Sequence, residues 1–275
     1  MNPTWRALAR EAAIAAEHIA IGATALSKAD FFRHAYYSQA FFALSIGFER
    51  ASKLVLAVDH AVEHNGIFPA TNTLRCLGHD LRSLLDATDE VALRRKILVH
   101  GCRLPRTSTH DSIIKVLSDF ANNLTRYYNL SLVTRDPGTA GVSDPVKAWF
   151  DAVITPILVD RYGTRQRARH QRVARINERL LGNHALVRYT NEVGEKLDSV
   201  EASSLWAAQI RFAAPYARMH VMQMARFLGA VLSELGHAGH KLREPLIPDF
   251  SEFFAIFNNE DKYFLRRRTW SIYRR

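Results

Sequence analysis

The sequence has few cysteines and no apolar run long enough to cross a membrane. Cys76 and Cys102 are the only cysteines among 275 residues, too few for a disulfide framework or a thiolate zinc site. The apolar stretch near the N-terminus is interrupted by Glu11, Glu17 and His18, whereas a membrane span needs about 18 uncharged residues. We therefore expect reduced thiols, no signal peptide, no membrane contact and a cytoplasmic location.

Proline and glycine are also scarce, at 9 and 13 residues, and alternating runs of Val, Ile and Thr are rare. Apolar residues recur at helical spacing almost throughout, which predicts an all-α fold without internal repeats. Turn-forming residues at 135–143 predict a linker between a helical domain at 1–134 and a basic helical domain at 144–275. The helices expected within them are 3–27, 30–64, 73–86, 89–100, 109–132, 144–160, 164–182, 184–198, 202–236 and 249–266.

Several catalytic motifs are missing. The sequence has no Gly-x-Gly-x-x-Gly, no P-loop and no Gly-x-Ser-x-Gly, so dinucleotide chemistry, Walker-type hydrolysis and a nucleophile elbow have no support. His60-Ala-Val-Glu-His64 fits the pattern of inverted zinc peptidases. The helix is expected to end at Asn65, however, which favours a polar helix end. We expect no cofactor and no metal.

Positive charge is abundant and unevenly placed. The chain has 37 basic and 27 acidic residues, a net charge of +10, and 29 of the cations are Arg. Beyond Thr134 there are 22 basic and 15 acidic residues, a surplus of +7. Arg suits two-pronged contact with phosphate or carboxylate, so the composition indicates an acidic partner that binds the C-terminal half.

Residues 161–179 contain seven Arg against Glu178 alone. At 100° per residue, one stripe about 120° wide holds six of them: Arg161, Arg165, Arg169, Arg172, Arg175 and Arg179. If a helix begins after Gly163, Arg161 leaves the stripe and five remain. The stripe predicts contact with a phosphate backbone, and the alternative is a solvated helix or one paired with acids elsewhere in the fold.

The tail, residues 262–275, has six cations and no acid. Aromatic residues lie between them, a pattern typical of segments that pair phosphates and stack bases. The nucleic-acid-binding candidates here are Arg266, Arg267, Arg268 and Trp270. An equal alternative is a terminal helix whose aromatic side chains dock in the core.

The first half of the chain resembles HEPN domains. The resemblance is carried by the Ala-rich run Tyr37–Leu56 with its Glu49/Lys53 pair, a loop containing Gly66 and Pro69, and the sequence Leu77-Gly-His-Asp-Leu81. HEPN domains are antiparallel helical bundles of toxin–antitoxin, CRISPR and phage-defence systems. The resemblance implies an N-terminal helical bundle, a homodimer and an operon-encoded protein partner.

Two overlays of this family remain open. Arg95-Lys-Ile-Leu-Val-His100 looks like the Arg-x(4–6)-His motif of HEPN ribonucleases; the resemblance implies that His100 is the acid or base and that Arg95 steadies the phosphate, without metal. Alternatively, Thr125-Arg126-Tyr127 looks like the Arg-Tyr-Pro ending of non-cleaving HEPN domains. That overlay implies a polar or nucleotide-binding site of His79, Asp80, Arg126 and Tyr127, although Asp80 equally suits a helix N-cap.

Together these features predict an RNA-binding, HEPN-like protein of a bacterial defence or stress module. The catalytic hypothesis is metal-independent endoribonuclease activity at Arg95 and His100. The alternative is a non-catalytic helical subunit that binds an acidic protein partner or a nucleotide.

Overall fold

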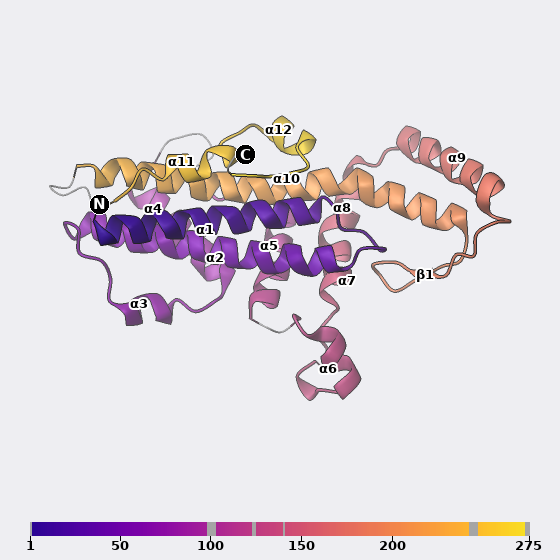
Figure 1. Cartoon of the computed structure of the whole chain (residues 1–275), viewed down its shortest axis with the longest axis horizontal. Coiled ribbons are helices and arrows are strands. Elements are labelled where there is room, and N and C mark those ends of the chain that lie inside the picture. Colours follow the sequence, from indigo (N-terminus) through magenta and orange to yellow (C-terminus); the bar gives the residue numbers. More distant parts are fainter. Residues whose placement is uncertain (1, 98–102, 123–124, 140, 242–246, 273–275) are drawn as a thin grey trace.

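The computed structural model describes residues 2–97, 103–122, 125–139, 141–241 and 247–272. The all-α fold is confirmed, and its longest helices run along one axis (Figure 1). The elements are α1 (Pro3–Leu26), α2 (Ala35–Glu63), α3 (Thr71–Cys76), α4 (Leu81–Arg94), α5 (Ser108–Ala121), α6 (Tyr128–Thr134), the 3-10 turn η1 (Pro137–Thr139), α7 (Pro145–Trp149), the π-helical turn η2 (Phe150–Ile154), α8 (Thr155–Arg161), α9 (Thr164–Leu181), β1 (Tyr189–Thr190), β2 (Lys196–Leu197), α10 (Val200–Gly239), α11 (Ser251–Phe254), the 3-10 turn η3 (Ala255–Phe257) and α12 (Asp261–Arg266). No helix in the described ranges is long and apolar enough to span a bilayer.

The helices α1 and α2 form an antiparallel pair at the centre of the fold. Asn2 begins α1 by accepting a hydrogen bond from the backbone N–H of Thr4 at 2.8 Å, and Pro3 occupies the first helical position. The two helices approach closely at Gly47, where an added Cβ would lie 2.9 Å from the backbone nitrogen of Ile19. The small residues of the Ala-rich run therefore set the spacing of this pair.

The helix α10 packs along the α1–α2 pair and extends beyond it. Its 40 residues span roughly 60 Å, and Ser199 caps its start by accepting from the N–H of Ala202 at 3.1 Å. The part that projects past α1 and α2 is also where α9 and the β-hairpin lie (Figure 1). One end of the molecule is consequently built from α9, the hairpin and the first turns of α10.

The helix α12 is anchored by a buried arginine, and the segment after it by Trp270. Arg218 of α10 donates to the carbonyl oxygens of Phe264 and Leu265, at 3.1 Å each from Nη2, and to the hydroxyl of Ser27. The backbone N–H of Trp270 donates to Thr24 Oγ1 at 2.9 Å. These bonds fix α12 and its tail across α10 and α1.

Residues on both sides of 135–143 contribute to one hydrophobic cluster. Phe41 of α2, for example, contacts Trp149 of α7 with ring centroids 5.4 Å apart. The short α6 has no buried residue and projects from the body (Figure 1). Residues 135–143 thus connect two stretches that share a core, and the division into domains 1–134 and 144–275 stays a prediction.

The helix predicted over 184–198 is wrong, because this segment is a β-hairpin in which Tyr189 pairs with Leu197. Asn191 forms the turn: its Oδ1 accepts from the backbone N–H groups of Val193 and Glu195 at 3.1 and 2.8 Å. Gly194 follows at φ +89°, a conformation that L-residues rarely adopt. Turn chemistry outweighed the helical spacing of the apolar residues here.

Candidate nucleic-acid interface

The arginine stripe lies on one exposed face of α9. Gly163 precedes the helix, so the five-residue alternative describes the structure, and Arg161 instead ends α8, with its guanidinium 5.0 Å from the ring of Tyr216. The five arginines are exposed along the whole helix: Arg165, Arg169, Arg172, Arg175 and Arg179. From the first to the last, the face is roughly 21 Å long.

The opposite face of α9 holds the helix on α10. Ala174 is its buried residue, Asn177 Nδ2 donates to Ser204 Oγ at 3.2 Å, and Glu178 accepts from the backbone N–H of Glu201 at 2.7 Å. Because these contacts fix the rotation of α9 about its axis, most of the stripe faces away from α10, while Arg169 lines the groove beside α10 and Arg175 approaches Glu201.

The stripe is almost unpaired. Arg175 lies 3.9 Å from a carboxylate oxygen of Glu201, at the limit of an ion pair. The side chains of Arg165, Arg169, Arg172 and Arg179 form no salt bridge with any carboxylate in the described ranges. The alternative in which the stripe pairs with acids of its own fold therefore does not describe these four residues.

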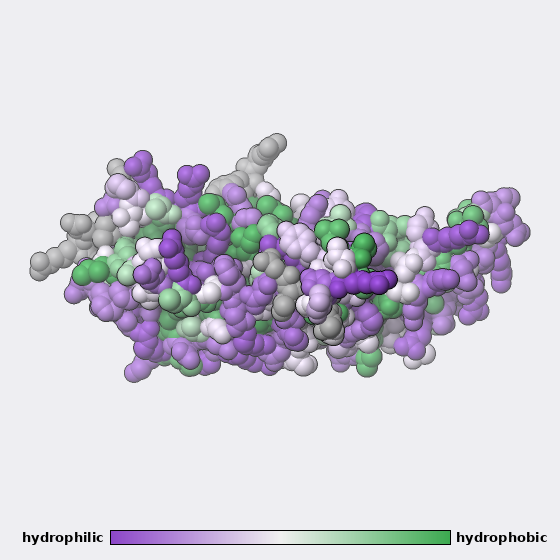
Figure 2. All heavy atoms as spheres, turned by 90° about the horizontal axis from the view of Figure 1, so that it is seen from below, coloured by the Kyte–Doolittle hydropathy of each residue, from purple (hydrophilic) through white to green (hydrophobic). Residues whose placement is uncertain are grey.

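Apolar side chains lie beside the arginines on the same face. Val173 is 49% exposed, Ile176 46% and Leu180 66%, a spacing that places all three next to the stripe. Figure 2 shows hydrophilic side chains gathered at this end of the molecule with smaller hydrophobic areas between them. The face is thus cationic and partly apolar.

A groove of 610 Å³ separates α9 from α10. Arg169 of α9 and Arg211 of α10 both line it, together with His170 and the aromatic side chains of Phe212 and Tyr216. Burial lowers the pKa of His170, and the charges of Arg169 and Arg211 add to this effect. The cations and aromatic side chains of this groove give it the composition of a single-strand binding surface.

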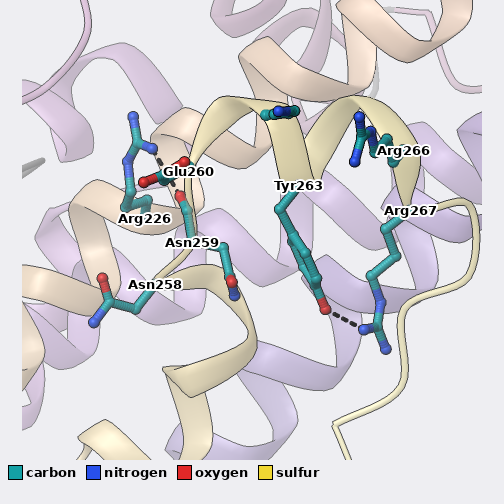
Figure 3. Close-up of a pocket in the computed structure, with 8 residues that line it drawn as sticks. Arg226, Asn258, Asn259, Glu260, Tyr263, Arg266 and Arg267 are labelled. Atoms are coloured by element: carbon teal, nitrogen blue, oxygen red, sulfur yellow. Dashed lines mark hydrogen bonds between the residues drawn. The ribbon is translucent and has the colours of Figure 1, made fainter.

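A second cationic cavity lies at α12. Leu265 lines the groove, and the next residue, Arg266, lines a 790 Å³ pocket with Arg226 of α10 (Figure 3). From Ser204 to Arg226 along α10 the distance is roughly 33 Å. The two cavities therefore lie one after the other along α10.

The tail candidates divide between surface and core. Arg266 and Arg268 are exposed, whereas Trp270 is 5% exposed and packs against the rings of Phe264 and Tyr263. The docked alternative therefore describes the aromatic side chains of Phe264 and Trp270. The indole of Trp270 is not accessible to a base.

Arg95 lies within an ion-pair cluster. Its Nε donates to Asp59 Oδ1 and its Nη2 to the backbone carbonyl of Asp59 at 2.9 Å, while neighbouring Arg94 pairs with Asp59 and Glu63. The other predicted catalytic residue, His100, lies outside the described residues. The guanidinium of Arg95 thus ties α4 to α2, and catalysis at this pair stays a prediction.

Asp80 is the N-cap of α4, as the alternative interpretation predicted. It accepts from the backbone N–H of Ser83 at 3.1 Å and from the hydroxyl of Ser118 at 2.7 Å. The hydroxyl of Ser83 also donates to Asp80, and this bond first, then the bond from Ser118, lowers the pKa of the Asp80 carboxyl. His79 is exposed, with its Nδ1 2.9 Å from Glu49 Oε1, so both residues have partners within the fold.

Arg126 stacks over two aromatic rings, with its guanidinium carbon 5.1 Å from the centroid of Phe42 and 5.7 Å from that of Phe120. It lines a 340 Å³ cavity with Tyr127, whose side chain is 58% exposed. The structure shows no contact that joins this pair to His79 and Asp80. The four-residue polar site stays a prediction.

The His60–His64 motif is engaged at the end of α2. The two rings stack with centroids 3.9 Å apart, and their Nδ1 atoms bond to the carbonyls of Ile67 and His60. Glu63 of the motif pairs with Arg94. Among the described residues, no group of three or more His, Cys, Asp or Glu side chains is placed to hold a metal.

Two arginines that line these cavities were not predicted from the sequence. Arg211 and Arg226 stand alone among apolar residues of α10, so neither belongs to a visible charge cluster. Their contribution follows from the crossing of α9 and α12 over α10. An isolated Arg in a long apolar helix was the one available sign.

Comparison of the chain with protein-family models, with curated proteins and with solved structures finds no match. The resemblance to HEPN domains therefore stays a prediction based on the motifs quoted above.

Proposed function

We propose that this protein binds nucleic acid through the exposed arginine face of α9. The observation that carries the proposal is that four arginines on one ordered helix face have no carboxylate partner in the described structure. Guanidinium groups in such an array pair with phosphates and release counterions, which favours binding to polyanions. RNA is the polymer that the HEPN resemblance implies, within a bacterial defence or stress module.

The groove between α9 and α10 favours a bound strand that is longer than α9 itself. The groove with Arg169, Arg211 and Tyr216 offers cations and aromatic rings together, the combination that holds single strands without base specificity. A strand on the α9 face would continue along α10 toward Arg266.

The salt dependence of RNA binding tests the proposal. Five phosphate contacts predict that log K falls with log[salt] at a slope of about −3.5 on single-stranded RNA, and affinity falls about hundredfold between about 50 and 200 mM salt. The triple variant Arg169→Gln/Arg172→Gln/Arg179→Gln removes three contacts and reduces the slope to about −1.4. Fluorescence anisotropy with labelled RNA measures both.

A control variant removes the same charge at the other end of the molecule. Arg6, Arg10 and Arg75 are exposed on α1 and α3, far from α9 in Figure 1, so Arg6→Gln/Arg10→Gln/Arg75→Gln should keep the wild-type slope. Equal losses of RNA affinity in the two triple variants would show that binding depends on net charge and not on the α9 face. Wild-type protein that binds no RNA even at low salt would refute the proposal.

The exposed apolar residues favour a second candidate, an acidic protein partner. Val173, Ile176 and Leu180 lie beside the stripe, and amphipathic helix faces of this kind dock in grooves of partner proteins. Val173→Ser/Ile176→Ser/Leu180→Ser should leave the RNA salt slope unchanged if phosphates are the ligand. Loss of partner binding in this variant, with no RNA binding by the wild type, would favour the protein partner.

The endoribonuclease hypothesis needs a separate assay. The purified protein is incubated with RNA and a chelator, alone and with the products of neighbouring genes. Loss of cleavage in both Arg95→Ala and His100→Ala would support it. Undiminished cleavage by either variant, or no cleavage by the wild type, would exclude this site. For Arg95 to contact a phosphate, its guanidinium must first release Asp59.

A further inference from the structure

We infer that the pocket between α10 and α12 binds the phosphomonoester group of a nucleotide. The pocket has a volume of 790 Å³, within the range of small-molecule sites. Four cations and one acid are among its lining residues: Arg226, Lys262, Arg266, Arg267 and Glu260. The tail pattern predicted Arg266 and Arg267 as nucleic-acid-binding residues, but not a pocket that they share with Arg226.

Three of these cations keep their charge uncompensated. Lys262 and Arg266 are exposed and form no salt bridge within the described ranges. Arg267 bonds only to neutral oxygens, donating from Nε to the carbonyl of Thr269 at 2.9 Å and from Nη1 to the hydroxyl of Tyr263. Because Arg226 already pairs with Asp261 at 3.1 Å, the attraction for an anion comes from the other three.

Arg267 is held in place before any ligand arrives. Its guanidinium carbon lies 5.4 Å from the ring centroids of both Tyr263 and Trp270, and Trp270 is buried. The two bonds from Nε and Nη1 leave Nη2 to donate to a ligand. A pre-positioned guanidinium loses little entropy on binding a phosphate oxygen.

The opposite wall has groups suited to the rest of a nucleotide. Figure 3 shows Asn258 and Asn259 on the same side as Arg226 and Glu260, across from Tyr263 and Arg267. Asn258 is exposed, and its amide can both donate to and accept from a base edge. Amides that line the same pocket as the three unpaired cations match a base and its phosphate.

The phosphate has two sources, a free nucleotide or the phosphorylated end of RNA. The second rests on the proposed function, because an RNA strand bound at α9 would have to run along α10 to bring its end to this pocket. Both share the same dianionic group, which a phosphodiester inside a strand lacks. A site with three free cations prefers the dianion.

The experiment compares RNA that carries a 5′-phosphate with the same RNA ending in a 5′-hydroxyl, and measures AMP binding by calorimetry with adenosine as the control ligand. We expect about tenfold tighter binding for the phosphorylated member of at least one pair. Lys262→Gln/Arg266→Gln should abolish that preference. Arg6→Gln/Arg10→Gln removes the same charge from exposed positions of α1 that do not line the pocket, and should retain it.

The outcomes separate this inference from the proposed function. A preference for phosphorylated RNA identifies the strand end as the source, and AMP binding without an RNA end preference identifies a free nucleotide. Salt-dependent RNA binding with neither preference refutes phosphate binding in the pocket and leaves the proposed function standing. A preference retained in Lys262→Gln/Arg266→Gln also refutes phosphate binding in the pocket. AMP binding without RNA binding refutes the proposed function alone.

Discussion

A histidine pair between α5 and α10, with His110 buried and His220 partly exposed, should make the fold sensitive to acid. The rings of His110 and His220 meet edge to face with centroids 4.7 Å apart. The hydroxyl of Thr107 bonds to His110 Nδ1, and Gln223 Oε1 accepts from His110 Nε2 at 2.9 Å and from His220 Nδ1 at 3.1 Å. Gln223 Nε2 donates in turn to Asp261 at 2.8 Å. In this network both rings are neutral.

The size of the effect follows from the pKa of His110. Burial, and next the neighbouring His220, lower it from 6.5 to about 4, and burial also lowers the pKa of His220. The unfolded chain binds these protons at a higher pH than the folded protein does. The free energy of unfolding therefore decreases as pH falls from about 6.5 toward about 4. His110 alone should contribute a loss of about 2 kcal/mol near pH 5 and about 3 kcal/mol near pH 4.

Urea unfolding at several pH values measures this loss. His110→Gln/His220→Gln should flatten the dependence between about pH 7 and pH 5, even if the variant is less stable throughout. His184→Gln, at an exposed site, should keep the wild-type dependence. An equally steep loss in the double variant and the wild type would refute the reasoning.

Two further predictions concern packing and buried charge. Gly47→Ala should destabilise the protein by about 1–3 kcal/mol, because the new Cβ would lie 2.7 Å from Ile19 Cγ1 and 2.9 Å from its nitrogen; unchanged urea stability would contradict this. Arg218→Met should cost about 2–4 kcal/mol, since it leaves the carbonyls of Phe264 and Leu265 without donors. Hydrogen exchange should then quicken in α12, and protection equal to that of the wild type would show that other contacts hold it.

The start of α9 and its arginine face could be predicted because both depend on local sequence. Gly163 breaks the helix before it, and the spacing from Arg165 to Arg179 determines one face whatever lies around it. That the face is free of carboxylates could not be predicted, because pairing is a tertiary property. The sequence is compatible both with a stripe that pairs with carboxylates and with an unpaired stripe. In the described structure, Arg175 is the one member of the stripe that lies near a carboxylate, that of Glu201.

The remaining sites depended on contacts between distant residues. In the sequence, the position of Trp270 is equally compatible with base stacking and with packing in the core. The structure decides for the core, because Trp270 packs against the rings of Phe264 and Tyr263. Arg226 gives no sign in the sequence of lining a pocket, since its neighbours there come from α12. Local patterns predict helices and faces, whereas pockets require the chain to be folded.

The bond between Trp270 and Thr24 joins positions 246 residues apart. A nascent chain therefore exposes the end of α1 until the segment that covers it has left the ribosome. Closing so long a loop is entropically unfavourable unless the intervening helices are already in place. Docking of this segment should then be a late step of folding.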